Sequence, residues 1–447
     1  MDVSPKNKNE GSKTSIQSEH NASGALIPMV IIGVLFFIFG FVTWLNGALI
    51  PFLQIVCQLT VMQALMISFT FYIAYVVMAL PMAFVIEKLG YKVSMSAGLF
   101  IIAFGFLLFV PAAKTQAFGI FLIAQFVVGS GLTILQTASN PYLVQVGPQE
   151  TAAVRISIMG LLNKSAGVIS PLIFTALILA DMPDVSAHSL ALLSETERLA
   201  QIDVLSNNLI LPYIGLAIAL LLLGFALKFS ALPELESHDV DNNLDQNKGS
   251  IFRFPHLILG VVTLFMYVGV EVIAGDTIGL FGSSLGLPNA TSLTSYTMAF
   301  MVLGYLVGML LIPRVINQVQ ALTGSAVLGL IISVLVVFSS PYDTQVSLFL
   351  WGWIGLTELP NTIVYIALLG FANALVWPAV WPLALDGLGR FTAQGSALLI
   401  MGISGGAVLP LVFGGLSDHF GGQQAYWMMI PCYLFILFYA LKGCKLR

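Results

Sequence analysis

The stretch PMVIIGVLFFIFGFVTWLNGALI, from Pro28 to Ile50, decides the fold. It contains no Asp, Glu, Lys or Arg, and it exceeds the roughly 20 apolar residues that a helix needs to cross a membrane. Of the chain's 447 residues, 58% are hydrophobic and 9% are charged, and the mean hydropathy is +0.95. A soluble domain is about a quarter charged. The composition therefore predicts a polytopic membrane protein and excludes a soluble enzyme or a nucleic-acid-binding protein.

Hydropathy predicts an all-α chain with twelve such spans. The first six lie near residues 28–50, 62–86, 93–112, 117–146, 153–179 and 208–230, and the second six near 256–281, 293–313, 321–339, 362–385, 394–416 and 424–441. The polar segment Pro233–Ser250 separates the two groups. We therefore predict two six-helix bundles at residues 26–230 and 256–441, a linker at 231–255, and tails at 1–25 and 442–447. The apolar stretch Leu348–Leu356 is too short to span and is expected to be a loop or a helix extension.

The basic residues are distributed unevenly between the two sides of the predicted bundle. Of the 17 Lys and Arg residues, Lys114 and Arg198 fall on one side and Lys164 lies within a span, which leaves 14 on the side of both termini. Basic residues concentrate in cytoplasmic loops. We therefore expect both termini in the cytoplasm and a location in the inner (plasma) membrane.

The two halves of the sequence weakly repeat each other. GFVTWLNGALIPF (40–52) aligns with GVEVIAGDTIGLF (269–281), which sets Gly47 against Asp276. LQTASNPYLVQVGPQETA (135–152) is similar to ANALVWPAVWPLALDGLGRFTA (372–393), and Pro141 matches Pro378. Because proline lacks an amide N–H, we expect bends at both. Two six-span halves in parallel repeat resemble the major facilitator superfamily, whose substrate sites lie between the halves near mid-membrane.

Four further segments carry a narrower resemblance. FFIFGFVTWLNGALIPFLQ, ALPMAFVIEKLGYK, LQTASNPYLVQVGP and YVGVEVIAGDTIG resemble the bacterial fucose/glucose-galactose symporters. The resemblance implies a hexose or amino-hexose substrate, cotransport with a cation, and a monomeric protein. The fucose branch has an aspartate and a glutamate where this chain has Gly47 and Gln136, neither of which accepts a proton at physiological pH. The chain is therefore closer to the glucose/galactose and N-acetylglucosamine branches, and we favour sodium over proton coupling.

Three ionisable residues lie well inside the predicted spans: Glu271 and Asp276 in span 7, and Lys164 in span 5. Such charges are costly and usually mark an ion or substrate path. We hypothesise that Glu271, Asp276 or both bind the coupled cation, and that a helical turn opened at Gly275 brings them together and offers carbonyl oxygens to sodium. Lys164 would compensate one of these charges or donate to a sugar hydroxyl. The alternative is a fixed ion pair of Lys164 with one acid, which helps the halves pack.

A neutral, hydroxyl-rich sugar is bound by amides and flat aromatic rings. The spans offer candidates of both types: Asn46, Gln136, Asn140, Asn163, Asn373 and Trp377. Gln136 and Asn140 share one face of span 4. The alternative is that the amides only join helices by hydrogen bonds.

The short loop between spans 2 and 3 resembles the cytoplasmic gating motif of the superfamily. Its charges bridge to helix ends when the cytoplasmic side is closed, and Gly90 permits its tight turn. The gate candidates are Glu87, Lys88, Lys92 and Arg314. Asp386, Arg390 and Asp418 are further candidates for the same closure, the alternative being that they are merely solvated.

Nothing in the sequence indicates catalysis or a bound cofactor: there is no HExxH, no GxxxxGK and no cysteine cluster. We predict a sodium-coupled symporter for a glucose- or galactose-type hexose that works by alternating access. Its partners would be the sugar, a monovalent cation and the lipid bilayer. The first alternative is a proton-coupled permease for N-acetylglucosamine or another hexose. A passive facilitator fits less well because of the membrane acids, and a transporter-like sugar receptor because no sizeable cytoplasmic domain is present.

Overall fold

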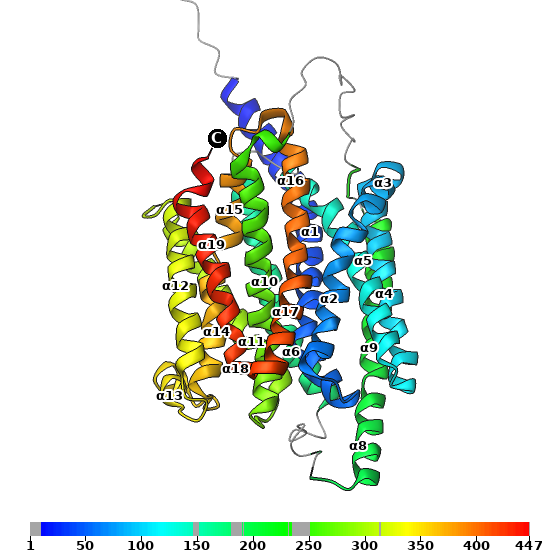
Figure 1. The fold of residues 1–447 in the computed structure, drawn as a ribbon. Helices are drawn as coiled ribbons and strands as arrows, with labels where there is room; N and C mark the ends of the chain where they lie inside the picture. The colour runs from blue at the N-terminus through cyan, green and yellow to red at the C-terminus, as the bar shows by residue number, and fades with distance from the viewer. Residues whose placement is uncertain are drawn as a thin grey trace, which may run out of the picture.

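The computed structural model describes residues 10–145, 152–179, 190, 192–230, 232–234, 251–312 and 314–446. All regular elements in these ranges are helices, and they stand side by side (Figure 1). Eleven helical segments are long and apolar enough to cross a membrane. The remaining predicted span is formed by the shorter apolar helix α2 (Val61–Val77), which continues into α3 (Ala79–Leu89). The prediction of an all-α, twelve-span fold is confirmed.

Except for α1, the first six spans begin and end within three residues of the predicted positions. Besides α2 with α3, they are α1 (Glu10–Val56), α4 (Tyr91–Thr115), α5 (Phe118–Gln145), α6 (Ala152–Ile178) and α9 (Ile210–Lys228). α1 reaches back into the segment predicted as a tail, and its apolar part begins at Ile27. Hydropathy does not predict the polar helix α8 (Glu195–Asn208), which begins with a capping box formed by Ser194 and Glu197.

The second six spans are more often divided. They are α10 (Pro255–Ser284), α11 (Thr294–Leu311), α12 (Gln318–Phe338), α14 (Asn361–Asn373) with α15 (Val376–Leu385), α16 (Thr392–Met401) with α17 (Gly405–Phe420), and α18 (Gly422–Ala425) with α19 (Met429–Leu441). The 3-10 turns of this half are η2 (Ile251–Arg253), η3 (Ala290–Ser292), η4 (Gly352–Ile354), η5 (Gly389–Phe391), η6 (Gly402–Ser404), η7 (Tyr426–Met428) and η8 (Gly443–Lys445).

Two questions raised by the sequence are answered by these bounds. Span 10 divides between α14 and α15 because Pro378 has no N–H to donate to the carbonyl of Ala374, whereas α5 continues as one helix past Pro141. The stretch Leu348–Leu356 belongs to a separate short helix, α13 (Gln345–Trp351), and the turn η4. It is neither a simple loop nor an extension of a span.

The two ends of the bundle carry different elements. The C-terminus, α3 and the start of α16 lie at one end, which we call the proximal end, and α8 and α13 lie at the other, the distal end (Figure 1). α2, α6 and α10 all run between these ends, so a residue's position along each helix gives its depth.

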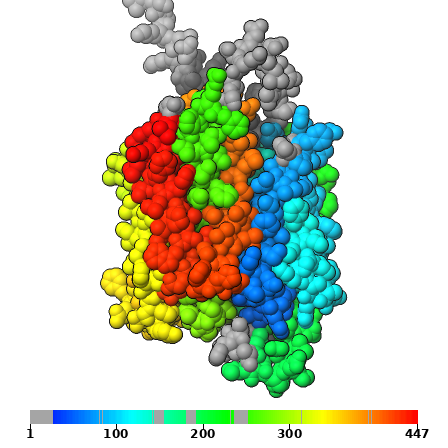
Figure 2. All heavy atoms as spheres, viewed as in Figure 1, coloured from blue at the N-terminus to red at the C-terminus, as the bar shows by residue number. Residues whose placement is uncertain are grey.

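The halves meet along a seam formed by α1, α2 and α6 on one side and α10, α11 and α17 on the other. Figure 2 shows part of this seam, where orange and red helices lie against blue ones. Glycines mark its closest approaches. A Cβ at Gly47 would lie 2.2 Å from Thr294 Oγ1, and a Cβ at Gly414 would lie 2.7 Å from Met62 Cα. Both contacts are in the distal part of the bundle, so the halves are joined there.

Each half also contains one very close helix pair. A Cβ at Gly40 on α1 would lie 1.8 Å from the backbone oxygen of Asn163 on α6, and a Cβ at Gly405 on α17 would lie 1.8 Å from that of Phe265 on α10. The repeat matches α1 with α10 and α6 with α16–α17. The same pair of spans therefore makes the same tight contact twice, as small residues allow in membranes.

We predict that Gly40→Ala destabilises the protein by about 1–3 kcal/mol, because its methyl group must push α1 away from α6. The measurement is the melting temperature of the purified protein in detergent. Gly215→Ala is the matched control, since a Cβ there meets nothing within 4 Å. Equal melting temperatures for the two variants would contradict this account of the packing.

Candidate functional site

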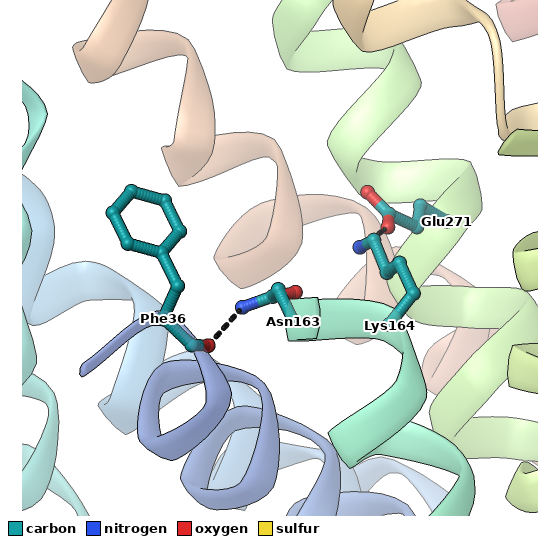
Figure 3. Close-up of polar contacts among 4 residues, drawn as sticks. All are labelled: Phe36, Asn163, Lys164 and Glu271. Carbon is teal, nitrogen blue, oxygen red and sulfur yellow. Dashed lines mark hydrogen bonds and ion pairs between the residues drawn. The ribbon is translucent and has the colours of Figure 1, made fainter. Parts of the chain in front are cut away.

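An ion pair inside the membrane links the two halves. Lys164 on α6 contacts the carboxylate of Glu271 on α10, and the two side chains are only 11% and 8% exposed (Figure 3). The Lys164 ammonium also lies 4.7 Å from the ring centroid of Trp44 on α1. A buried charge is tolerated when it is paired in this way. The structure thus contains the ion pair that we considered as the alternative to cation binding by Glu271.

α6 is held in place on both of its faces by two consecutive residues. Asn163 points toward α1, where its Nδ2 donates a hydrogen bond to the Phe36 carbonyl at 3.4 Å, while Lys164 points toward α10 (Figure 3). The Asn163 amide therefore joins α6 to α1 within the first half, and Lys164 joins α6 to α10 of the second half.

Tyrosines surround the Glu271 carboxylate. Tyr267 lies one turn earlier on α10 and is fully buried next to Glu271. Tyr305 on α11 is also buried beside the acid. Neither residue was predicted from the sequence. A tyrosine hydroxyl inside an apolar span needs a polar partner, and that requirement is the signal that could have drawn attention to them.

Asp276 has a different environment from Glu271. It is 1% exposed, and its Oδ2 accepts a hydrogen bond from the Ser68 hydroxyl on α2, in the other half, at 2.5 Å. α10 is a continuous helix from Pro255 to Ser284, so the expected opened turn at Gly275 is wrong. Gly275 instead allows close packing, because a Cβ there would lie 2.4 Å from the Trp44 ring.

Most of the predicted amides bind protein partners. Gln136 Nε2 donates to the Tyr75 hydroxyl at 2.9 Å. Asn46 Oδ1 accepts from Gln125 Nε2 at 2.7 Å, so the two amides join α1 to α5. These bonds are those that the helix-joining alternative predicts. Asn140 is half-buried near the proximal end of α5.

Asn373 and Trp377 lie on either side of the break between α14 and α15. Asn373 Oδ1 accepts from the Tyr433 hydroxyl at 2.8 Å. The Trp377 ring lies 6.3 Å from that of Tyr267 and 5.5 Å from that of Trp381, measured between centroids. An aromatic wall therefore extends from the neighbourhood of Glu271 along α15.

Four buried N–H donors in this region have no hydrogen-bond partner among the described residues. They are Trp44 Nε1 and Asn46 Nδ2 in the first half, and Asn373 Nδ2 and Trp381 Nε1 in the second. A buried donor without a partner costs about 1–3 kcal/mol. They lie in both halves, on α1, α14 and α15, and such donors fit a ligand that offers acceptor oxygens.

The predicted gate loop contacts the chain that follows α9. Lys92 Nζ donates to the Ser230 carbonyl at 2.6 Å, and its backbone N–H donates to Glu234 at 3.2 Å. Glu87 and Lys88 are exposed, as is Arg314 in the equivalent loop of the second half. In this conformation the loop is thus bound within its own half.

Tyr142 fixes the same segment. Its hydroxyl donates to the Pro233 carbonyl at 2.7 Å.

Asp418 is not near the other charged residues with which we grouped it. It lies at the end of α17 and binds the first turn of α2 at the distal end, whereas Asp386 follows α15 at the proximal end. Its assignment to a proximal closure is therefore wrong. The direction of span 11 places it at the distal end.

Comparison with known proteins agrees with this architecture. A model of the Major Facilitator Superfamily matches residues 32–404. The chain belongs to the major facilitator superfamily. It is 32% identical to a glucose/galactose transporter of Brucella abortus, over 97% of each chain, and 27% identical to the L-fucose-proton symporter of Escherichia coli, over 93% of this chain and 92% of that one.

A solved structure of this superfamily, a fucose transporter in the outward conformation, shares the fold. Its TM-score to this structure is 0.67 at 25% sequence identity, covering 93% of this chain and 98% of that chain. The resemblance to the fucose/glucose-galactose symporters is confirmed. This superfamily member is therefore a multi-pass membrane transporter and not an enzyme.

We predict that Lys164→Met destabilises this transporter by about 3–5 kcal/mol, because it leaves the Glu271 carboxylate buried without a counter-charge. The double variant Lys164→Met/Glu271→Gln should recover most of that loss. Melting temperatures in detergent for the native protein, both single variants and the double variant measure the coupling between the two residues. A double variant that is as unstable as the sum of the single variants would contradict a direct ion pair.

Proposed function

We propose that this chain is a cation-coupled hexose symporter of the inner (plasma) membrane with both termini in the cytoplasm. The relatives named glucose/galactose transporter and L-fucose-proton symporter, which match nearly the full chain, support a sugar substrate. The excess of basic residues on the side of the termini supports the orientation. In this orientation the proximal end is cytoplasmic and the distal end faces outward.

The observation that carries the proposal is the environment of Asp276. An ionised carboxylate that is 1% exposed is costly unless a positive charge compensates it. Its described hydrogen-bond partner, the Ser68 hydroxyl, carries no charge. Asp276 is therefore neutralised in this state by a proton or by a bound cation, as an acid that couples ion movement to transport requires.

A proton fits this site better than sodium. Sodium needs several oxygen ligands, and in many transporters an unwound helix supplies some of them as carbonyls, whereas α10 is continuous through Asp276. The described residues also contain no cluster of three or more His, Cys, Asp or Glu side chains that could hold a metal ion. A proton needs a single carboxylate oxygen. Sodium, favoured by Gly47 and Gln136 in the sequence, is the second candidate.

Proton uptake would be coupled to sugar uptake because the half that covers Asp276 moves away when the distal end opens. α2 of the first half lies over the carboxylate when the distal end is closed, as it is here. When the halves part at that end, the Ser68 bond breaks and the carboxylate meets the outer solution. Asp276 would then take up its proton from outside together with the sugar, and carry it inward when the distal end closes again.

The sugar would lie between the halves near the Lys164–Glu271 pair. The unpartnered donors of Trp44, Asn46, Asn373 and Trp381 are complementary to hydroxyl oxygens. The Trp377 ring offers a flat face to a pyranose.

We predict that Asp276→Asn abolishes accumulation of glucose or galactose against a gradient but leaves sugar counterflow, because the amide keeps the shape and cannot carry a proton. Uptake of radiolabelled sugar into proteoliposomes, with pH and sodium gradients imposed separately, measures this. The pH gradient should drive the native protein, and the exposed acid variant Asp203→Asn on α8 should behave like it. Accumulation by Asp276→Asn at the native level removes this acid from the coupling, and native uptake driven by sodium alone favours the second candidate.

We predict that Asn373→Ala raises the KM for sugar about tenfold, the effect of losing one hydrogen bond to the substrate. Counterflow assays in proteoliposomes give the KM. Tyr433→Phe is the matched control, because it removes the bond to Asn373 Oδ1 and leaves the free Nδ2 donor. The same KM in both variants would mean that Asn373 only joins helices.

A further inference from the structure

The first turn of α2, at the distal end, has its backbone N–H groups bound from two sources. The first N–H groups of a helix have no partner within it. Thr60 Oγ1 accepts from the Gln63 N–H, and the Gln63 side chain accepts from the Thr60 N–H, which forms a capping box. This local cap leaves the N–H groups of Val61 and Met62.

Asp418 binds both of these groups from the other half of the protein. Its Oδ1 accepts from the Val61 N–H at 3.1 Å and its Oδ2 from the Met62 N–H at 3.3 Å. One turn earlier on α17, Gly414 allows the close approach that this geometry needs, since a Cβ there would lie 2.7 Å from Met62 Cα. The cap of α2 is thus completed across the seam.

We propose that Asp418 is a latch that holds the distal end closed. Its negative charge lies at the positive end of the α2 dipole, where a carboxylate is stabilising. Two other bonds between the halves, Thr175 to Thr291 and Ser295 to the Val168 carbonyl, join α6 to η3 and α11 and involve uncharged groups only. Opening the distal end separates Asp418 from α2 and leaves both exposed to water, so the latch shifts the balance between the two states toward closure.

This inference rests on the alternating access proposed above, and its test uses neither sugar nor an ion gradient. Spin labels at Leu199 on α8 and Phe349 on α13 report the distance between the halves at the distal end, because both positions are exposed. Cys57, Cys432 and Cys444 are first replaced so that the labels react only at the introduced cysteines. Double electron–electron resonance then gives the populations of short and long distances.

Asp418→Ala should raise the ratio of open to closed molecules about fivefold, the usual effect of removing a helix cap. Asp418→Asn, which keeps an accepting oxygen and loses the charge, should lie between Asp418→Ala and the native protein. Glu358→Ala is the matched control, because it removes an exposed distal acid whose partner, Thr344, is in the same half.

An unchanged distance distribution in Asp418→Ala overturns the latch, and so does an equal shift in Glu358→Ala. If Asp418→Ala does not fold, Asp418→Asn decides by the same criterion. These outcomes are separate from a failure of the proposed function, because an absence of sugar transport does not alter the distances in the purified protein.

Discussion

The buried ion pair between Lys164 and Glu271 is the constraint on which the centre of this transporter depends. Two charges removed from water cost several kcal/mol each unless they remain paired, so α6 and α10 must stay in contact at mid-depth. Trp44, Tyr267 and Tyr305 pack around that contact. Both acids of α10 are bound by the opposite half, Glu271 by an ammonium and Asp276 by a hydroxyl. Any relative movement of the halves therefore acts directly on these carboxylates.

The repeat-related positions Gly47 and Asp276 differ in whether their surroundings can accommodate an acidic side chain. The fucose symporters are expected to carry an aspartate at this position, but here a Cβ would lie 2.2 Å from Thr294 Oγ1. The Thr294 hydroxyl donates in turn to the Gly275 carbonyl at 2.7 Å, next to Asp276. An acidic side chain at position 47 is thus incompatible with the closed distal seam. The acid appears instead at the repeat-related position, Asp276, where Ser68 provides a partner.

The sequence predicted the spans well because the thickness of the bilayer sets how many consecutive apolar residues a spanning helix needs. The division of span 10 follows the bend expected at Pro378. For the buried acids of span 7, the sequence left two roles open, cation binding and an ion pair with Lys164, and the structure contains the ion pair with Glu271. The partners Ser68 and Thr294 were missed, because contacts between halves depend on how the bundles pack. Gly275 illustrates the same limit, since a glycine that lets a helix open and one that lets a neighbour approach look identical in sequence.

The contacts between the halves follow one another in depth, and their order indicates how the halves separate. The ion pair lies at mid-depth, Asp276 lies five residues or about 7.5 Å further along α10, and Asp418 lies at the distal end. When two rigid bodies rock about a point, displacement grows with distance from it. A pivot near Lys164–Glu271 moves Asp418 most, Asp276 less and the ion pair least. Such a motion keeps the costliest charges paired while it exposes Asp276, whose partner is the neutral Ser68 hydroxyl, and ion-coupled alternating access requires this order of events.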